Sequence, residues 1–167
     1  MTLTIRRATR EDAALVTAIE AACFPPAEAA GIDRMTPRLA RFADHFWIAE
    51  EDGLPVGMIN GMVIDQKVID DVMYADASLH RPDGRWQSVF GIGVIPAYRG
   101  RGYAAALMKR LIAQAREEGR SGVVLTCKDH MIAFYEQFGY RSMGVSASEH
   151  GGAKWNDMIL EFEGVGQ

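Results

Sequence analysis

The stretch from Arg99 to Ala104 combines two arginines and two glycines in the order Arg-Gly-Arg-Gly-Tyr-Ala. It follows an apolar run over 88–95 that predicts a buried strand, and it precedes a helical pattern over 103–118. Glycine lets the backbone approach a ligand closely, and the first N–H groups of a helix have no partner inside the helix. This order predicts a phosphate-binding site, with Arg99 and Arg101 adding positive charge at its mouth.

The same turn also fits GxGxxA, a variant of the dinucleotide-binding fingerprint, over 100–105. Several features count against that alternative. The turn begins about five residues past the last apolar residue of the strand, and no acidic residue lies at the expected offset of about 20 residues. Strands and helices also precede the motif, whereas the fingerprint usually opens the first βαβ unit.

Arg99, Gly102 and Ala104 fit a second pattern, Arg-x-x-Gly-x-Ala, which resembles the acetyl-CoA diphosphate loop of the GNAT family of N-acetyltransferases. A segment over 133–140, Ala-Phe-Tyr-Glu-Gln-Phe-Gly-Tyr, is similar to another motif of that family. The resemblance covers nearly the whole chain. It implies a single N-acetyltransferase domain over 1–167 that uses acetyl-CoA as cosubstrate and no metal. The implied fold is the α/β (α+β) GNAT fold, a mixed, mostly antiparallel central sheet of about six to seven strands flanked by about four helices.

Three further segments resemble the arylalkylamine (serotonin) N-acetyltransferase branch of this family: 20–29, Leu79-His80-Arg81-Pro82-Asp83-Gly84, and Cys127-Lys128-Asp129 before Phe134-Tyr135. That branch carries two histidines, spaced H-x-H, in the strand before the loop. This chain has Ser88 and Phe90 at the matching positions. The difference leaves both the proton route and an aromatic amine substrate open, and a water held by Ser88 is one candidate relay.

The resemblance also implies how the cosubstrate binds. Backbone N–H groups from 100 to 105 would bind its diphosphate, and the strand before them would splay from its neighbour and offer backbone groups to the pantetheine arm. Glycine inside a strand marks a bulge or a close backbone approach, so Gly91 and Gly93 fit this interpretation; the alternative is room for a bulky neighbour. The expected cosubstrate-binding residues are Ile92, Gly93, Val94, Arg99, Gly100, Arg101, Gly102, Tyr103, Ala104 and Ala105.

The resemblance places Tyr135 beside the sulfur of the cosubstrate, which makes it the expected catalytic acid. A phenol with a pKa near ~10 is able to protonate a departing thiolate, whose thiol has a pKa near ~8.5. The alternative is an ordinary core aromatic on an amphipathic helix. An attacking ammonium must also lose a proton, and the sequence names no single base. The candidates are Ser88, through a relay, and His45, His80, His130, His150, Glu28, Asp65, Asp76 and Glu149.

The elements that must position these residues follow from hydrophobic periodicity and from turn residues. Strands are expected near 3–8, 46–50, 56–64, 88–95, 122–127, 140–147 and 153–162. Helices are expected over 9–23, 33–45, 103–118 and 129–138. Thr9 and Asp12 have the spacing of a capping box, and Glu51-Asp52-Gly53 predicts a hairpin turn. The irregular stretch 65–87 is either a substrate lid or a solvated connector.

Composition narrows the class of protein. The net charge of −4 and the unclustered 18 Lys and Arg argue against nucleic-acid binding. No apolar run approaches the ~20 residues that span a bilayer, and the first residues lack a signal-peptide core. Cys23 and Cys127 have no CxxC spacing, which indicates neither a zinc site nor a disulfide scaffold. A cytoplasmic location is therefore expected, and the resemblance adds the prospect of a homodimer.

Together these observations predict an acetyl-CoA-dependent N-acetyltransferase in which a small primary amine, an arylalkylamine or a polyamine, attacks the thioester directly. Two alternatives stay open. One is an acetyltransferase for protein or peptide N-termini, and the other is a CoA-binding regulatory domain without turnover.

Overall fold

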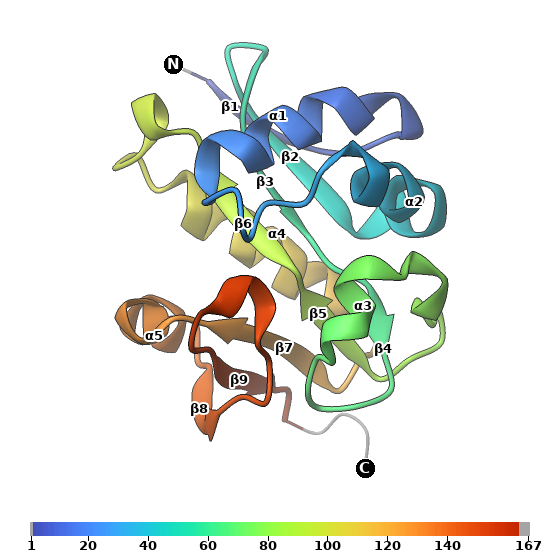
Figure 1. The fold of residues 1–167 in the computed structure, drawn as a ribbon. Coiled ribbons are helices and arrows are strands. Elements are labelled where there is room, and N and C mark those ends of the chain that lie inside the picture. Colours follow the sequence, from blue (N-terminus) through green and yellow to red (C-terminus); the bar gives the residue numbers. More distant parts are fainter. Residues whose placement is uncertain (1, 164–167) are drawn as a thin grey trace.

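The structure is a computed structural model that describes residues 2–163, and Figure 1 shows its elements. The described strands are β1 (Leu3–Arg7), β2 (Phe46–Glu51), β3 (Leu54–Asn60), β4 (Val63–Ile64), β5 (Trp86–Val89), β6 (Gly91–Val94), β7 (Gly122–Cys127), β8 (Arg141–Val145) and β9 (Asn156–Glu161). The described α-helices are α1 (Ala13–Cys23), α2 (Ile32–Phe42), α3 (Asp71–Ala75), α4 (Tyr103–Glu117) and α5 (Ile132–Glu136).

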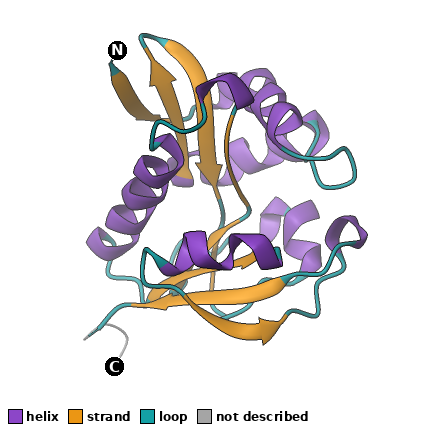
Figure 2. Cartoon of the chain, turned by 90° about the vertical axis from the view of Figure 1, so that its left-hand side faces the viewer, coloured by secondary structure: helices purple, strands orange, loops and turns teal. Residues whose placement is uncertain are grey.

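The strands form two sheets with the orders β1-β2-β3-β6 and β4-β5-β7-β9-β8. Their pairings are antiparallel except for the parallel pair β5–β7. Figure 2 shows the two groups of strands one above the other. The predicted mixed, mostly antiparallel GNAT fold flanked by helices is confirmed, with the strands divided between two sheets.

The predicted continuous strand over 88–95 is wrong, because Phe90 separates β5 from β6. The neighbouring strand predicted over 56–64 is divided opposite this point, into β3 and β4. The two segments still bond through the bend, from Phe90 N to Asn60 O at 2.7 Å and from Ser88 N to Met62 O at 2.9 Å. Gly61 permits this approach, since a Cβ there would lie 1.9 Å from the Ser88 carbonyl oxygen.

Both faces of the four-stranded sheet are buried. Phe46 and Ile48 of β2 belong to one apolar cluster, with residues of α1 and α2, whereas Trp47 and Ala49 belong to a second cluster with α4. Successive side chains of a strand point to opposite faces, so this alternation places α1 and α2 on one face and α4 on the other.

The predicted local signals are largely confirmed. Thr9 N donates to Asp12 Oδ2 at 2.8 Å in the capping box, although a 3-10 turn (Arg10–Asp12) precedes α1. Asp52 and Gly53 both have positive φ, as a tight hairpin turn requires. The helix predicted over 33–45 ends at Phe42, and the one predicted over 129–138 is reduced to a 3-10 turn and the short α5. The stretch 65–87 contains α3 and a 3-10 turn (Ala77–Leu79).

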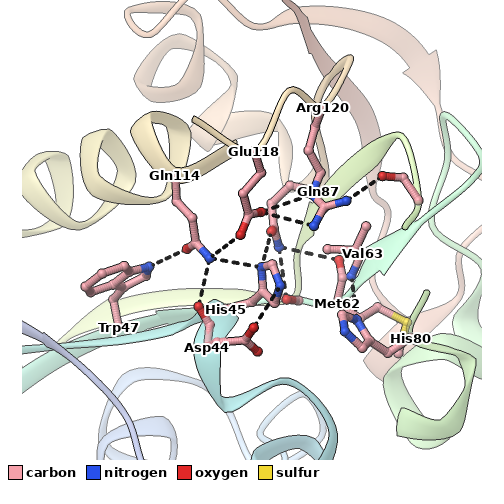
Figure 3. A network of polar contacts seen from close by, with 12 residues as sticks. Asp44, His45, Trp47, Met62, Val63, His80, Gln87, Gln114, Glu118 and Arg120 are labelled. Carbon is pink, nitrogen blue, oxygen red and sulfur yellow. Dashed lines mark hydrogen bonds and ion pairs between the residues drawn. The ribbon is translucent and has the colours of Figure 1, made fainter. Parts of the chain in front are cut away.

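A buried polar network lies beside the bend (Figure 3). His45 Nδ1 lies 2.8 Å from Gln87 Oε1, and Gln114 accepts the Trp47 indole N–H at 2.8 Å. His80 Nδ1 accepts the backbone N–H of Val63 at 3.0 Å. An imidazolium has no acceptor nitrogen, so this bond requires neutral His80. Burial, with His45 as a neighbour, lowers the pKa of His80 to about 4.

We predict that stability falls on acidification partly because of His80. Between pH 6.5 and pH 4 the unfolded imidazole binds a proton that the folded one does not, so stability is lost as the pH falls through this window. For the partly exposed His80 we expect a loss of about 1 kcal/mol by pH 5, or a few degrees of Tm. In His80→Asn, which keeps an acceptor oxygen, thermal melts at pH 7.5 and pH 5.0 should show a smaller drop. Equal drops would contradict the assignment.

Candidate active site

A cavity of about 700 Å³ opens where the two sheets part. One wall is formed by β6 and the end of α1, and the opposite wall by β7 and α5. The turn before α4 lies at one end of the cavity, and Tyr74, His150 and Trp155 also line the cavity. The break at Phe90 separates β5 from β6, so that β6 belongs to one sheet and β7 to the other.

The glycine turn has the geometry of an anion site. Gly100 and Gly102 have φ of +80° and +81°, a region that other residues adopt only with strain. Gly102 caps α4, whose first N–H groups lack partners within the helix and carry the positive end of its dipole. Of the predicted turn residues, Arg99, Gly100, Gly102, Tyr103, Ala104 and Ala105 line the cavity.

The two arginines of the turn do different things. Arg99 lines the cavity and donates from Nε to the Val94 carbonyl at 2.8 Å, which ties the turn to the end of β6. Arg101 is absent from the cavity lining, forms an ion pair with Glu51 and lies over the Tyr98 ring at 4.9 Å. The Tyr103 hydroxyl donates to the same Glu51 oxygen at 2.5 Å. Arg101 therefore braces the turn against the β2–β3 hairpin, whereas the sequence predicted charge at the mouth.

Strand β6 exposes one edge to the cavity. It pairs with β3 alone, and the pairing of β5 with β7 ends at Val89 opposite Leu125. The backbone of Gly91, Ile92, Gly93 and Val94 therefore lines the cavity, as the splayed strand was expected to do. Gly93 also makes room for a bulky neighbour, which was the alternative explanation for this glycine. A Cβ there would lie 2.8 Å from Cys23 Sγ of α1.

Tyr135 projects from α5 into the same cavity and is 7% exposed. Its ring packs edge-on against Phe134 and Tyr140, with centroids 5.1 and 6.0 Å away. Within residues 2–163 its hydroxyl has no hydrogen-bond partner. Burial raises the pKa of Tyr135 well above its ordinary value, so the phenol keeps its proton at neutral pH. Tyr135 is thus a buried aromatic whose protonated hydroxyl lies at the cavity, and its role as the acid stays a prediction.

Ser88 lies elsewhere. Its side chain is fully buried, donates to the Met62 carbonyl at 2.7 Å and is absent from the cavity lining. The relay proposed for Ser88 therefore has no direct access to the cavity. Phe90 does line it, with Tyr74 at a ring-centroid distance of 4.8 Å. Of the two residues that replace the H-x-H pair, Ser88 thus stabilises the bend and Phe90 forms part of the cavity wall.

The candidate bases also divide into two groups. His130, His150 and Glu28 line the cavity. His45 and His80 belong to the network of Figure 3, and Asp65, Asp76 and Glu149 are absent from the cavity lining.

Sequence reasoning missed several residues that line the cavity, Tyr74, Thr126 and Trp155 among them. Glu20 also lines it, and the sequence indicated this residue only as part of the segment 20–29. Tyr74 lies on α3 within the stretch predicted as a lid or a connector, and its hydroxyl lies 3.0 Å from Thr126 Oγ1. Burial raises the pKa of Tyr74 to about 12. The described residues contain no group of three or more His, Cys, Asp or Glu arranged to hold a metal, and no helix among them is long and apolar enough to cross a membrane.

Comparison with known proteins gives consistent matches. A family model, the acetyltransferase (GNAT) family, matches residues 13–140. "Probable N-acetyltransferase family 8 member 5" of Mus musculus is 32% identical over 66% of this chain and 44% of its own length. Serotonin N-acetyltransferase of Macaca mulatta is 27% identical over 68% of this chain and 55% of its own length. The chain thus spans only about half the length of these relatives.

Among solved structures, a GNAT-like decarboxylase, GphF, in complex with isobutyryl-CoA superimposes with a TM-score of 0.81, covering 95% of this chain and 98% of its own at 21% identity. This likeness concerns the fold. The family model covers most of the chain and includes the glycine turn, β6 and Tyr135. The chain therefore belongs to the acetyltransferase (GNAT) family.

Proposed function

We propose that this chain is an acetyl-CoA-dependent N-acetyltransferase that acetylates a small primary amine. One observation carries the proposal: a single cavity joins the glycine turn of α4, the free edge of β6 and the Tyr135 hydroxyl. These are an anion site, a strand edge that offers backbone hydrogen bonds, and a proton donor. Acyl transfer from a CoA thioester needs all three within the length of one cosubstrate molecule.

The residues present fit acetyl-CoA. The unpaired N–H groups at the start of α4 suit its diphosphate, and the positive-φ glycines leave the backbone uncovered there. The edge of β6 suits the amide groups of the pantetheine arm, as strand addition does for peptides. Membership of the acetyltransferase family, and the CoA thioester bound by the structurally similar decarboxylase, support the same assignment.

In the proposed reaction the neutral amine attacks the thioester carbon and forms the N–C bond. The C–S bond breaks with its electron pair on sulfur, and Tyr135 supplies a proton to that sulfur. A backbone N–H of β6 polarises the acetyl carbonyl and stabilises the negative charge that develops on its oxygen. Because burial keeps Tyr135 protonated at neutral pH, it is a donor at the moment the thiolate leaves.

A small acceptor amine is favoured over a polypeptide because the segment 146–155 covers one side of the cavity. His150 Nε2 lies 3.0 Å from the Glu28 carbonyl oxygen, Glu149 N donates to Asp71 at 3.0 Å, and Trp155 Nε1 donates to the His150 carbonyl at 2.8 Å. An extended peptide would have to displace these contacts. Phe24, Tyr74, Phe90, His150 and Trp155 give this part of the cavity aromatic walls, which suit an arylalkylamine better than a polyamine.

The test is release of CoA thiol from acetyl-CoA across phenethylamine, spermidine and a peptide with a free N-terminus. Turnover with the small amines and not the peptide is expected. Preference for the peptide would favour the N-terminal acetyltransferase alternative, and binding of acetyl-CoA without turnover would favour the regulatory domain. Thermal stabilisation by NAD rather than acetyl-CoA would favour the dinucleotide alternative. A cytoplasmic location, a homodimer, a single domain and the absence of nucleic-acid partners stay predictions.

We predict that Tyr135→Phe lowers kcat with the preferred amine by about 100-fold, the lower range for loss of a general acid. Phenylalanine keeps the ring contacts with Phe134 and Tyr140, so the Kd for acetyl-CoA should change less than twofold. Steady-state kinetics and calorimetric titration give the two quantities. An unaltered kcat would remove Tyr135 from the chemistry.

We predict that Gly102→Val weakens acetyl-CoA binding by more than tenfold. A β-branched residue is strained at φ +81°, and its side chain would reach the space of the diphosphate. Gly53→Val is the matched control, because Gly53 has φ +84° and, as at Gly102, a Cβ added there would meet no atom within 4 Å. Both variants should lose similar stability in thermal melts. Normal acetyl-CoA affinity in Gly102→Val would mean that the turn does not bind the diphosphate.

A further inference from the structure

Glu20 is a buried carboxylate in the wall of the cavity. It lies near the end of α1, lines the cavity and is 5% exposed. Its Oε2 accepts the backbone N–H of Ala30 at 3.0 Å, whereas Oε1 has no hydrogen-bond partner within residues 2–163. An unpaired buried oxygen is costly to a folded protein, so its presence in a cavity wall points to a role in binding or catalysis.

The free oxygen of Glu20 faces the strand that would hold the thioester. A Cβ built on Gly91 would lie 3.4 Å from Glu20 Oε1, 3.7 Å from Asn60 Nδ2 and 3.8 Å from Phe24 Cε2. Gly91 is the first residue of β6, directly after the bend where β5 and β6 part. Glycine at this position therefore leaves no side chain between the carboxylate and the cavity edge of β6.

The positive charge of Arg38 partly compensates the buried negative charge of Glu20. It is 4% exposed, donates to the Tyr74 carbonyl at 2.9 Å and to Asn60 Oδ1 at 3.3 Å, and lies over the Phe90 ring at 4.9 Å. Burial raises the pKa of Glu20, while the Ala30 N–H and the charge of Arg38 lower it. The carboxylate is thus held between two opposing influences, which suits a group that gains and loses a proton.

Two of the other candidate bases in the cavity, Glu28 and His150, have polar partners of their own. Glu28 pairs with Lys128 at 2.7 Å, and His150 uses Nε2 on the Glu28 carbonyl oxygen. The Tyr74 hydroxyl is bonded to Thr126. Among the described acidic residues that line the cavity, Glu20 alone keeps a carboxylate oxygen that is both buried and unpaired.

We propose that Glu20 binds the ammonium group of the acceptor amine and accepts its proton, acting as the catalytic base. This inference rests on the proposed function. One N–H proton of the ammonium passes to Oε1, and the freed lone pair forms the N–C bond with the thioester carbon. The C–S bond breaks, Tyr135 gives its proton to sulfur, and the tyrosinate recovers a proton from the new amide nitrogen. Glu20 releases the remaining proton to solvent, so the reaction yields amide, CoA thiol and one proton.

The first test is Glu20→Gln, which keeps an oxygen for the Ala30 N–H and removes the charge. We expect kcat/KM for phenethylamine to fall at least about 100-fold, with the Kd for acetyl-CoA and the Tm near those of the unmodified chain. The acidic limb of the pH–rate profile should disappear. The charged or titratable groups that act on Glu20 or respond to its charge, Arg38 of α2 and Cys23 of α1, are unchanged in this variant.

Glu28→Gln is the charge-matched control, since it removes one negative charge from the same cavity and should keep the acidic limb. A second variant, Gly91→Ala, would place a methyl group 3.4 Å from Oε1, an ordinary contact at a residue without positive φ. It should fold normally and raise the KM for phenethylamine more than tenfold while acetyl-CoA affinity holds. Unchanged kinetics and an unchanged pH profile in Glu20→Gln would overturn the proposal.

A readout that needs no turnover separates this proposal from the proposed function. In protein labelled with ¹³C at the Glu carboxyls, the Glu20 signal is identified by its loss in Glu20→Gln. With CoA bound, phenethylamine should shift that signal saturably, and Gly91→Ala should suppress the shift. A signal that does not respond overturns the role of Glu20 even if the chain acetylates amines. A response without thiol release would support the ammonium site and contradict the proposed function.

Discussion

The bend at Phe90 is the constraint on which the rest of the structure depends. The segments 60–62 and 88–90 stay hydrogen-bonded to each other while the sheet divides, through Phe90 N to Asn60 O and Ser88 N to Met62 O. They lie so close together that Gly61 has no room for a side chain. Past the bend β6 follows β3, and β7 stays with β5 and β9. A strand edge is thereby left without partners at the wall of the cavity, where Gly91, Ile92 and Gly93 are only partly buried. A cosubstrate that binds as an extra strand would supply them.

The bend also explains why charge is buried beside the cavity. Where two sheets part, apolar side chains cannot cap every backbone group, and Arg38 bonds to carbonyl and amide oxygens from α3 and β3 while its guanidinium covers Phe90. Burying this cation is costly unless an anion lies nearby. Glu20 is that anion, although the two groups form no direct ion pair. Each keeps one polar atom without a hydrogen-bond partner, Arg38 Nε and Glu20 Oε1, because the two side chains do not bond to each other.

The parts of this site that depend on local sequence could be predicted. The glycine turn, the start and end of α4 and the capping box follow from spacing within a few residues. The parts set by long-range packing could not. Ser88 looked suited to a relay because of its place in a motif, yet the bend turns its hydroxyl to Met62. Arg101 is drawn away by Glu51, fifty residues earlier, and Glu20 reaches the cavity only because α1 packs on glycines of β6.

The two groups proposed for proton transfer come from different walls of the cavity, and burial raises the pKa of both. Tyr135 is surrounded by aromatic rings with no hydrogen-bond partner among the described residues, which favours its neutral, proton-bearing form. Burial raises the pKa of Glu20 above its ordinary value, and the Ala30 N–H and the nearby Arg38 guanidinium offset part of that rise. A phenol without such an offset and a carboxylate with one keep well-separated pKa values, so one donates while the other accepts at the same pH. The divergence of β6 from β7 then does more than open a space, because it lets the proposed base on α1 and the proposed donor on α5 line one cavity from different elements.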